Sequence, residues 1–364
     1  MGFKCGLVGL PNVGKSTIFN ALTSQHVPSS NYPFCTIDPN VGIVPLKDER
    51  LDKIGEKVGS AKVTPTSIDF IDIAGLVKGA SKGEGLGNQF LNHIQGVDAI
   101  AHVIRCFEDE NVAHTTPQLD PVNDVEVIMT ELILHDLEIV ERHLEKLEQA
   151  MKSGDPKLKQ RLPELTEIHQ RLSEGIPLKK MILSDIGLEL IHEINLLTIK
   201  PAIYIANVDE NHYQDSPFVD QLQHYAEQMN EPCVKISGKV QEEISQLDEE
   251  SQTEFLTEWG LDELSLNKIV RAGYQVLDLI TFFTANENEA HAWTIPRGTV
   301  VQKAAGKIHT DFEKGFIKAE VIKYSELIDF GSETKLREHG KIAIHGKDYV
   351  VEDGDLIFFR SKNP

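Results

Sequence analysis

Gly9-Leu10-Pro11-Asn12-Val13-Gly14-Lys15-Ser16 follows the apolar residues 5–8 and leads into the helix-prone residues 17–22. The stretch matches the phosphate-binding loop G-x-x-x-x-G-K-[ST], and it lies between an expected strand and an expected helix, as that loop does. Gly9 and Gly14 permit backbone angles that turn successive N–H groups toward a polyphosphate. The following helix directs its positive N-terminal end at the same anion. The stretch therefore predicts a nucleotide-binding protein.

The side chains of this loop each have a task in binding a nucleotide. Lys15 would place a positive charge beside the β- and γ-phosphates, which makes it a catalytic candidate, and the Ser16 hydroxyl would bind Mg²⁺. A chance glycine turn with a solvated lysine is the alternative, and the agreement of strand, spacing and helix argues against it. The residues predicted to contact the nucleotide here are Asn12, Val13, Gly14, Lys15, Ser16 and Thr17.

Length and composition limit the class of protein. The chain has 364 residues, too many for one ordinary core, and we expect two or three domains. No stretch approaches the roughly 20 apolar residues that span a bilayer, and the first residues read as a strand rather than a signal peptide. We therefore expect a cytoplasmic protein without a membrane partner. The cysteines lack C-x-x-C spacing, which argues against a zinc site or a disulfide framework and fits a reducing compartment.

The formal net charge is −21, so the overall field of the molecule cannot attract nucleic acid. Such a contact would need a local basic surface. Residues 296–323 offer one, with six Lys or Arg against three acids, whereas residues 241–263 carry nine acids and no Lys or Arg. We expect the basic stretch to form a nucleic-acid contact, and a solvated face with alternating lysines is the alternative.

Two downstream stretches have the pattern of a nucleotide-dependent switch. Residues 31–40 are rich in turn formers, and the hydroxyl of Thr36 is the candidate that would meet Mg²⁺ when a γ-phosphate is present. In isolation, a plain surface turn explains that stretch equally well. Residues 67–75 read as a buried strand ending in D-x-x-G, in which Asp72 would hold Mg²⁺ through water and the Gly75 N–H would sense the γ-phosphate. The predicted metal ligands are Ser16, Thr36 and Asp72.

Helical periodicity dominates the middle of the chain. Apolar residues recur at spacings of four and three over residues 133–151, and again over residues 158–172. Ser153-Gly154-Asp155-Pro156 interrupts the pattern. The sequence therefore predicts an antiparallel helical hairpin inserted into the sheet domain and held by its apolar seam. Lysines and an arginine surround its tip, for which a solvated surface and a nucleic-acid contact both remain open.

The remaining pattern predicts an α/β fold with a smaller second domain. Apolar runs at residues 96–105, 201–206 and 232–236 are typical of a parallel sheet covered on both faces. From about residue 280 the pattern changes to short strands and turns, which predicts a separate α+β domain. We expect a P-loop NTPase domain in two parts, residues 1–110 and 200–279. A helical arm, residues 111–199, is inserted between them, and a C-terminal domain covers residues 280–364.

Together these motifs resemble the YchF family of Obg-like ATPases along essentially the whole chain. The resemblance is carried by residues 9–16, by Asp72-Ile73-Ala74-Gly75-Leu76, by Asn207-Val208-Asp209-Glu210, by the helical insertion, and by residues 304–312, which are similar to part of a TGS domain. It implies a P-loop switch domain with a coiled-coil arm, a β-grasp TGS domain, hydrolysis of ATP in preference to GTP, and association with the ribosome.

The hydrolytic residues depart from the pattern of ordinary GTPases. Many of them place a water-orienting glutamine after D-x-x-G, where this chain has Leu76, which cannot hydrogen-bond a nucleophile. We therefore expect slow unassisted hydrolysis. His114 is the candidate replacement, because an imidazole can orient or deprotonate water near neutral pH, and His93 and His102 are its rivals. Asn12 adds the hypothesis that an amide oxygen helps to hold K⁺ as a second cation.

The expected base-reading loop also departs from that pattern. In the guanine-selective N-K-x-D loop, the aspartate accepts hydrogen bonds from guanine and the lysine stem packs along the base. Here Asn207 keeps the first position, but Val208 replaces the lysine and Glu210 the aspartate. Because the longer Glu210 would lose the paired guanine contacts, we expect ATP to bind more tightly than GTP, with Asn207 and the backbone near Val208 and Ser237 reading adenine.

Two other functions remain open from the sequence. One is an Obg-type GTPase, and the other is a nucleotide-sensing, RNA-binding adaptor with little turnover. The sequence does not determine the oligomeric state, and a monomer is the favoured expectation.

Overall fold

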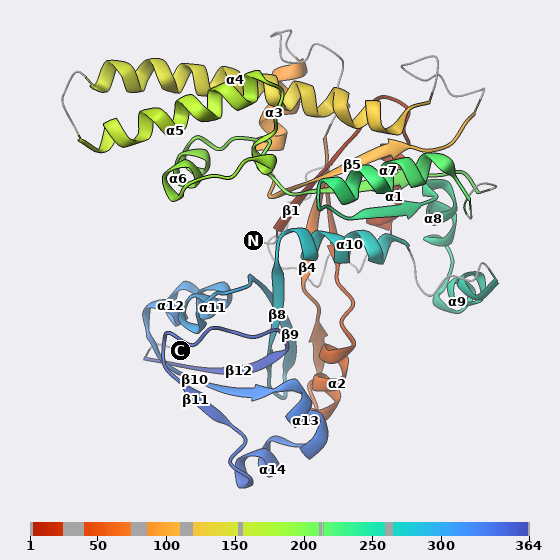
Figure 1. Cartoon of the computed structure of the whole chain (residues 1–364). Helices are drawn as coiled ribbons and strands as arrows, with labels where there is room; N and C mark the ends of the chain where they lie inside the picture. The colour runs from red at the N-terminus through yellow and green to blue at the C-terminus, as the bar shows by residue number, and fades with distance from the viewer. Residues whose placement is uncertain are drawn as a thin grey trace.

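The structure, a computed structural model, describes residues 3–24, 40–73, 86–109, 119–151, 156–210, 213, 215–258 and 265–362. Its first body is a six-stranded sheet in the order β2-β4-β1-β5-β6-β7 (Figure 1). Only β2 runs antiparallel to its neighbour, β4. Every residue of β5 and β6 is buried, as expected for parallel strands covered on both faces. The elements are β1 (Phe3–Val8), α1 (Lys15–Ser24), β2 (Val41–Pro45), β4 (Ser67–Asp72), α3 (Leu86–Gln95), β5 (Ala99–Arg105), β6 (Ala202–Asn207), α7 (Pro217–Gln228), β7 (Cys233–Ile236), α8 (Gly238–Ile244), α9 (Glu249–Glu258) and α10 (Ser265–Val276).

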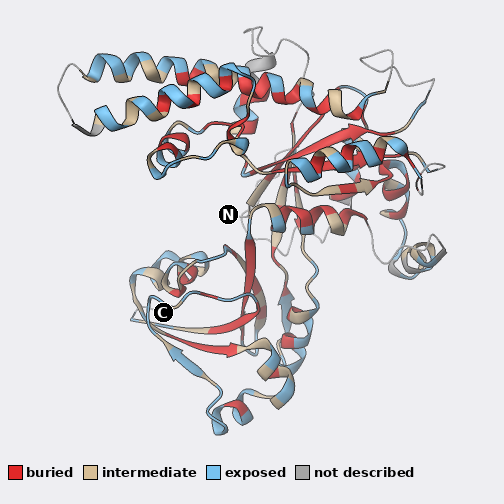
Figure 2. Ribbon diagram, viewed as in Figure 1, coloured by how far each residue is buried: buried red, intermediate tan, exposed pale blue. Residues whose placement is uncertain are grey.

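A helical arm projects from this sheet, as predicted. It consists of α4 (Pro121–Ala150), α5 (Pro156–Ser173), the short 3₁₀ helix η4 (Leu178–Lys180) and α6 (Asp185–Ile194). The seam between α4 and α5 is apolar, with Val140 and Ile168 buried in it, whereas the outer faces are exposed (Figure 2). Among the described residues, no helix is both long and apolar enough to cross a membrane.

A buried carboxylate fixes the arm to the sheet body. Asp136 of α4 is fully buried and accepts hydrogen bonds from the N–H groups of Leu197 and Thr198 and from the Thr198 hydroxyl. Leu197 and Thr198 lie just before β6, so these bonds tie the arm to the strand that carries Asn207. Burial raises the pKa of Asp136 to about 6, against the opposing effect of its three hydrogen-bond donors.

The second body is another six-stranded sheet, in the order β11-β10-β12-β8-β9-β3 (Figure 1). One hydrophobic cluster contains Phe283, Ile322 and Leu356, and another contains Phe282, Val321 and Ile357, so residues that alternate along the strands face opposite sides. The elements of this body are α2 (Glu49–Val58), β3 (Lys62–Thr64), β8 (Leu279–Ala285), β9 (Glu289–Pro296), α11 (Val301–Ile308), α12 (Thr310–Lys314), β10 (Phe316–Lys323), α13 (Tyr324–Phe330), α14 (Glu333–Glu338), β11 (Ala343–His345) and β12 (Asp355–Ser361).

One feature of this body was not expected from the sequence. Residues 49–64, included in the first expected segment 1–110, contribute α2 and the edge strand β3 to the second sheet. The expected domain boundaries remain a prediction, and they must allow for residues 49–64 belonging to the second body.

Candidate nucleotide-binding site

The loop between β1 and α1 has a shape that requires small residues at two positions. Gly14 has a φ of 89°, and a Cβ atom there would lie 2.2 Å from Asn207 Nδ2. At Gly9, a Cβ atom would lie 2.7 Å from the Val103 carbonyl oxygen. Asn12 also adopts a left-handed conformation, with a φ of 64°. The loop therefore packs closely against Val103 of β5 and Asn207 of β6, and both glycines predicted from the motif are needed for this packing.

A cleft of about 580 Å³ opens above this loop. Helix α1 begins at Lys15, so its N-terminal N–H groups and positive dipole end face the same space. Ser16 is exposed at that helix end. The residues that line the cleft are Leu10, Pro11, Asn12, Val13, Gly14, Lys15, Ser16, Thr17 and Asp72.

Asp72 reaches the cleft because β4 pairs in parallel with β1, with Asp72 beside Leu7. Its carboxylate forms an ion pair with the Lys15 ammonium. An exposed hydroxyl and a carboxylate in one cleft are oxygen donors of the kind that Mg²⁺ prefers, with substrate phosphates supplying further ligands. Ser16 and Asp72 thus fit a Mg²⁺ site. Among the described residues, no group of three or more His, Cys, Asp or Glu side chains offers an all-protein site.

Asn207, at the end of β6, joins the phosphate loop to the loop after β7. Its Nδ2 donates to the Val13 carbonyl oxygen at 2.8 Å, and its Oδ1 accepts from the Gly238 N–H at 3.0 Å. The side chain is buried. The Asn207 amide group therefore fixes the phosphate loop and the loop after β7 relative to each other.

Family models match both sheet bodies. One, described as a 50S ribosome-binding GTPase, matches residues 4–145, and a YchF GTPase C-terminal domain model, described as a protein of unknown function, matches residues 279–362. The protein named ribosome-binding ATPase YchF from Haemophilus ducreyi is 48% identical over 360 residues, covering 99% of both chains. The chain belongs to the YchF family. The Bacillus subtilis protein of the same name is 44% identical over 363 residues, again covering 99% of both chains.

A solved structure of a YchF protein has the same architecture. The Schizosaccharomyces pombe YchF GTPase matches with a TM-score of 0.89 and 37% identity, over 99% of this chain and 98% of that one. The predicted α/β P-loop fold with an additional C-terminal domain is confirmed. As a YchF family member, the chain is a nucleoside triphosphatase.

The positions expected to read the base can be located in the structure of this YchF protein. Val208 is buried in an apolar cluster with Ile104 and Tyr204, so its side chain serves packing. Glu210 is exposed, and its carboxylate lies 3.7 Å from the Lys239 ammonium. Ser237, at the N-terminus of α8, is buried, and its Oγ has no hydrogen-bond partner in the described part of the chain. Ser237 is therefore the predicted residue with an unused polar atom at this side of the site.

Three predicted site residues, Thr36, Gly75 and His114, lie outside the described residues, as does Leu76. Their roles stay predictions. The rivals of His114 can be compared: His93 is exposed on α3, whereas His102 is fully buried on β5 and stacks on Tyr204. Burial, helped by the charge of Lys179, lowers the pKa of His102 to about 3. A histidine closed off from water in this way is a core residue and not a base for hydrolysis.

The sequence analysis missed one position that shapes the site, Gly238. Its N–H is the donor to Asn207, and a Cβ atom there would lie 3.1 Å from Ile18 of α1. The signal available in the sequence was a glycine directly after the β7 strand, one residue beyond Ser237. Glycine at this position lets α8 approach α1 next to the Asn207 side chain.

Proposed function

We propose that this chain is a Mg²⁺-dependent ATPase of the cytoplasm that hydrolyses ATP in preference to GTP and binds the ribosome. The observation that carries the base preference is the state of the Asn207–Glu210 loop. At the lysine position of N-K-x-D, Val208 is buried in the core, and at the aspartate position, Glu210 points its carboxylate toward Lys239.

Guanine recognition needs a carboxylate fixed beside the N1–H and N2 amine of the base. The Glu210 side chain is about half exposed and its partner Lys239 is exposed, so this ion pair is weak and does not hold the carboxylate in one place. Each polar group left unpaired in a binding site costs about 1–3 kcal/mol, which is about 5- to 150-fold in affinity. The loop therefore supports adenine, which needs no such carboxylate. Asn207 keeps one N–H for the base, because its other N–H and its oxygen already serve Val13 and Gly238.

Hydrolysis rests on charge stabilisation by the phosphate loop. The loop N–H groups, the α1 N-terminus and Lys15 would stabilise the charge of the transferring phosphoryl group. Ser16 and Thr36 would bind Mg²⁺ directly and Asp72 would hold it through water, with the Gly75 N–H on the γ-phosphate. Bound Mg²⁺ would neutralise charge that develops between the β- and γ-phosphates. K⁺ beside Asn12 is proposed as a second cation that speeds turnover.

Ribosome binding is proposed from the relatives, which carry it in their names. The basic stretch of residues 296–323 is only partly available for such a contact. Lys303 pairs with Glu313, and Lys323 pairs with buried Asp355. Lys314 is exposed at the end of α12, and Lys307 lies 5.0 Å from the ring of Phe3. These two lysines are the candidates for contact with ribosomal RNA.

Titration of fluorescent ATP and GTP under one buffer tests the base preference, and tighter GTP binding would reject it. Turnover measured with and without ribosomes separates an ATPase from an adaptor that only senses nucleotide. Glu210→Asp is the variant of choice, because it restores the aspartate of the guanine-reading loop. Val208→Lys is less suitable, because it would bury a charge. We expect GTP affinity to rise about threefold or more in Glu210→Asp, with ATP affinity unchanged. Rates compared in Na⁺ and K⁺ buffers test the second cation.

A further inference from the structure

The strands next to the nucleotide cleft continue into the second sheet. At one end, β4 finishes at Asp72, which pairs with Lys15, and the Asp72 N–H donates to the Asn40 carbonyl oxygen just before β2. At the other end, the chain between β2 and β4, residues 46–66, contains α2 and β3. We call residues 46–66 the link segment. It is flanked by β2 and β4 of the first sheet, but its middle lies in the other body.

The link segment is built into the second sheet. Strand β3 pairs in parallel with β9 over the three positions from Lys62 to Thr64. Leu51 and Ile54 of α2 are buried in the cluster that contains Phe283 and Leu356. Burying these two large aliphatic side chains stabilises the docking of α2 on the second sheet. The segment therefore moves with the second sheet rather than as a surface loop.

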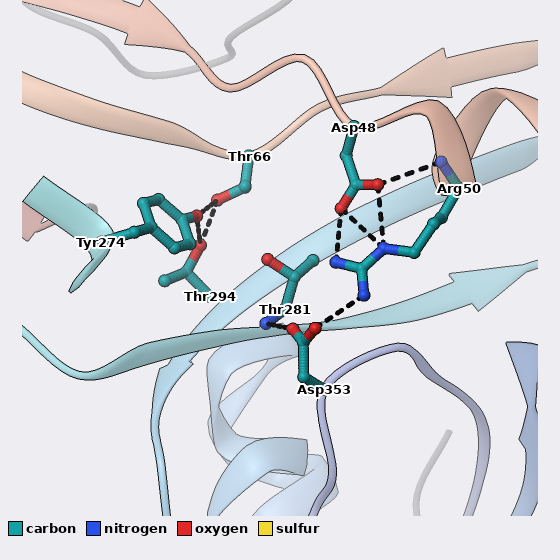
Figure 3. A network of polar contacts seen from close by, with 7 residues as sticks. All are labelled: Asp48, Arg50, Thr66, Tyr274, Thr281, Thr294 and Asp353. Carbon is teal, nitrogen blue, oxygen red and sulfur yellow. Dashed lines mark hydrogen bonds and ion pairs between the residues drawn. The ribbon is translucent and has the colours of Figure 1, made fainter. Parts of the chain in front are cut away.

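Arg50 locks the start of the link segment (Figure 3). Its guanidinium donates to Asp48 within the segment at 2.7 Å and to Asp353 of the loop before β12 at 2.6 Å. The other Asp353 oxygen accepts from the Thr281 N–H of β8 at 2.9 Å. These carboxylates raise the pKa of Arg50 beyond its already high value, so the guanidinium stays charged.

Tyr274 locks the end of the segment (Figure 3). This residue belongs to α10 of the first body, and its hydroxyl hydrogen-bonds Thr294 of β9 and Thr66, the last residue of the segment. Thr66 and Thr294 also bond each other. Three hydroxyls from both bodies therefore meet where the chain returns to β4.

We infer that the link segment couples the nucleotide state of the phosphate site to the position of the second sheet, with Arg50 and Tyr274 as its positioning residues. The inference rests on the proposed function, since it needs the site to bind ATP and ADP. The part that would move is the edge of the first sheet, because β2 is paired on one side only, by β4. Strand β4 ends at Asp72, whose carboxylate pairs with Lys15 and must change partners when Mg²⁺ and phosphates bind. A shift at that end is carried along two strands into a segment that the second sheet holds.

Coupling of this kind is reciprocal. If the nucleotide state changes how the link segment is held against the second sheet, then weakening the Arg50 contacts of that segment must change the relative affinity for ATP and ADP. This holds although Arg50 touches neither ligand. We expect Arg50→Gln to change the ratio of the Kd for Mg-ADP to the Kd for a non-hydrolysable Mg-ATP analogue by about threefold or more. Arg337→Gln is the matched control, since Arg337 pairs with Glu333 and Glu320 on the surface of the second sheet body. Its ratio should match that of the wild type.

Tyr274→Phe is a second, milder variant, which keeps the ring and removes only the shared hydroxyl. It should move the ratio in the same direction as Arg50→Gln. Equal changes in both Kd values, or no change in either variant, would overturn the inference.

Hydrogen exchange of the wild-type protein separates this failure from failure of the proposed function. With coupling, the ATP analogue protects both residues 9–17 and residues 279–285, whereas ADP protects the second stretch less. Protection of residues 9–17 alone would leave nucleotide binding intact and overturn the coupling. Protection of neither stretch would overturn both.

Discussion

The Lys15 ammonium and the Asp72 carboxylate form an ion pair inside the phosphate cleft. Both side chains are largely shielded, at 11% and 20% exposure, so the pair occupies the space that phosphates and Mg²⁺ would use. Each partner compensates the charge of the other until the ligand arrives. Binding would then give Lys15 to phosphate and Asp72 to the metal, without leaving either charge buried alone.

Lys15→Ala should therefore remove hydrolysis and leave the fold intact. We expect turnover to fall by about 10²-fold or more, because Lys15 stabilises charge that develops in the transition state. The melting temperature should fall only slightly, because Asp72 lines the cleft and water there can solvate its carboxylate once Lys15 is removed. Ser16→Ala should give a similar loss through Mg²⁺. Lys303→Ala, at an exposed ion pair of the second sheet body, is the control. Wild-type turnover in the Lys15 or Ser16 variant would refute the assignment.

Gly14→Ala should damage both the phosphate loop and its connection to the base side. The new methyl group would meet Asn207 Nδ2 and push it from the Val13 carbonyl oxygen. We expect a loss of about 1–3 kcal/mol in stability together with a large loss of nucleotide affinity. Gly175→Ala isolates the backbone effect, because Gly175 has a φ of 77° with no atom within 4 Å of an added Cβ. It should lose about 1 kcal/mol by urea unfolding and keep its nucleotide affinity. Equal nucleotide affinities in the two variants would contradict the contact with Asn207.

Much of the fold could be predicted because the signals are local. Apolar runs identified β5 and β6, and the helical spacing identified the arm. Strand β3 was not predicted, because three residues show no periodicity and its partner strand β9 is more than 200 residues away along the chain. The turn before β12 could not be located from the sequence either, because it depends on the buried carboxylate of Asp355, which accepts from the Glu352 N–H and the Tyr349 hydroxyl.

The candidate site was predictable to the same extent. A complete motif placed Lys15 and Ser16 in the cleft, and a strand-end pattern added Asp72. The brace formed by Asn207 was not predictable, since its partners Val13 and Gly238 lie 194 and 31 residues away along the chain. The burial of Val208 was also hidden, because a substitution in a motif does not show which way the side chain points.

His102 should make the protein sensitive to acid. Its pKa is lowered by burial from 6.5 to about 3 in the folded state, so between these values the unfolded chain binds one more proton than the folded one. The stabilising effect of the neutral ring is therefore complete above pH 6.5 and declines as the pH falls, by about 1.4 kcal/mol per unit. Urea unfolding at pH 7, 6 and 5 measures this slope. His102→Phe keeps an aromatic ring beside Tyr204 but cannot titrate, and it should flatten the slope.

The control for this titration is His93→Phe, at an exposed position of α3. It should keep the pH dependence of the wild type. An unchanged slope in His102→Phe would show that other groups cause the loss of stability in acid.

Reversing Lys307 and Lys314 should weaken ribosome binding more than reversing other lysines nearby. Neither has a carboxylate within 4 Å in the described part of the chain, so both charges remain available to phosphates. Each phosphate contact contributes about one unit to the slope of log K against log salt, so Lys307→Glu with Lys314→Glu should reduce that slope by about 2. Lys303→Glu with Lys341→Glu is the matched control, because it makes the same change in net charge at lysines already paired with Glu313 and Glu326. Co-sedimentation with ribosomes across a salt series measures both pairs. Equal weakening would indicate a general effect of net charge, and unchanged binding in the first pair would show that this surface faces solvent.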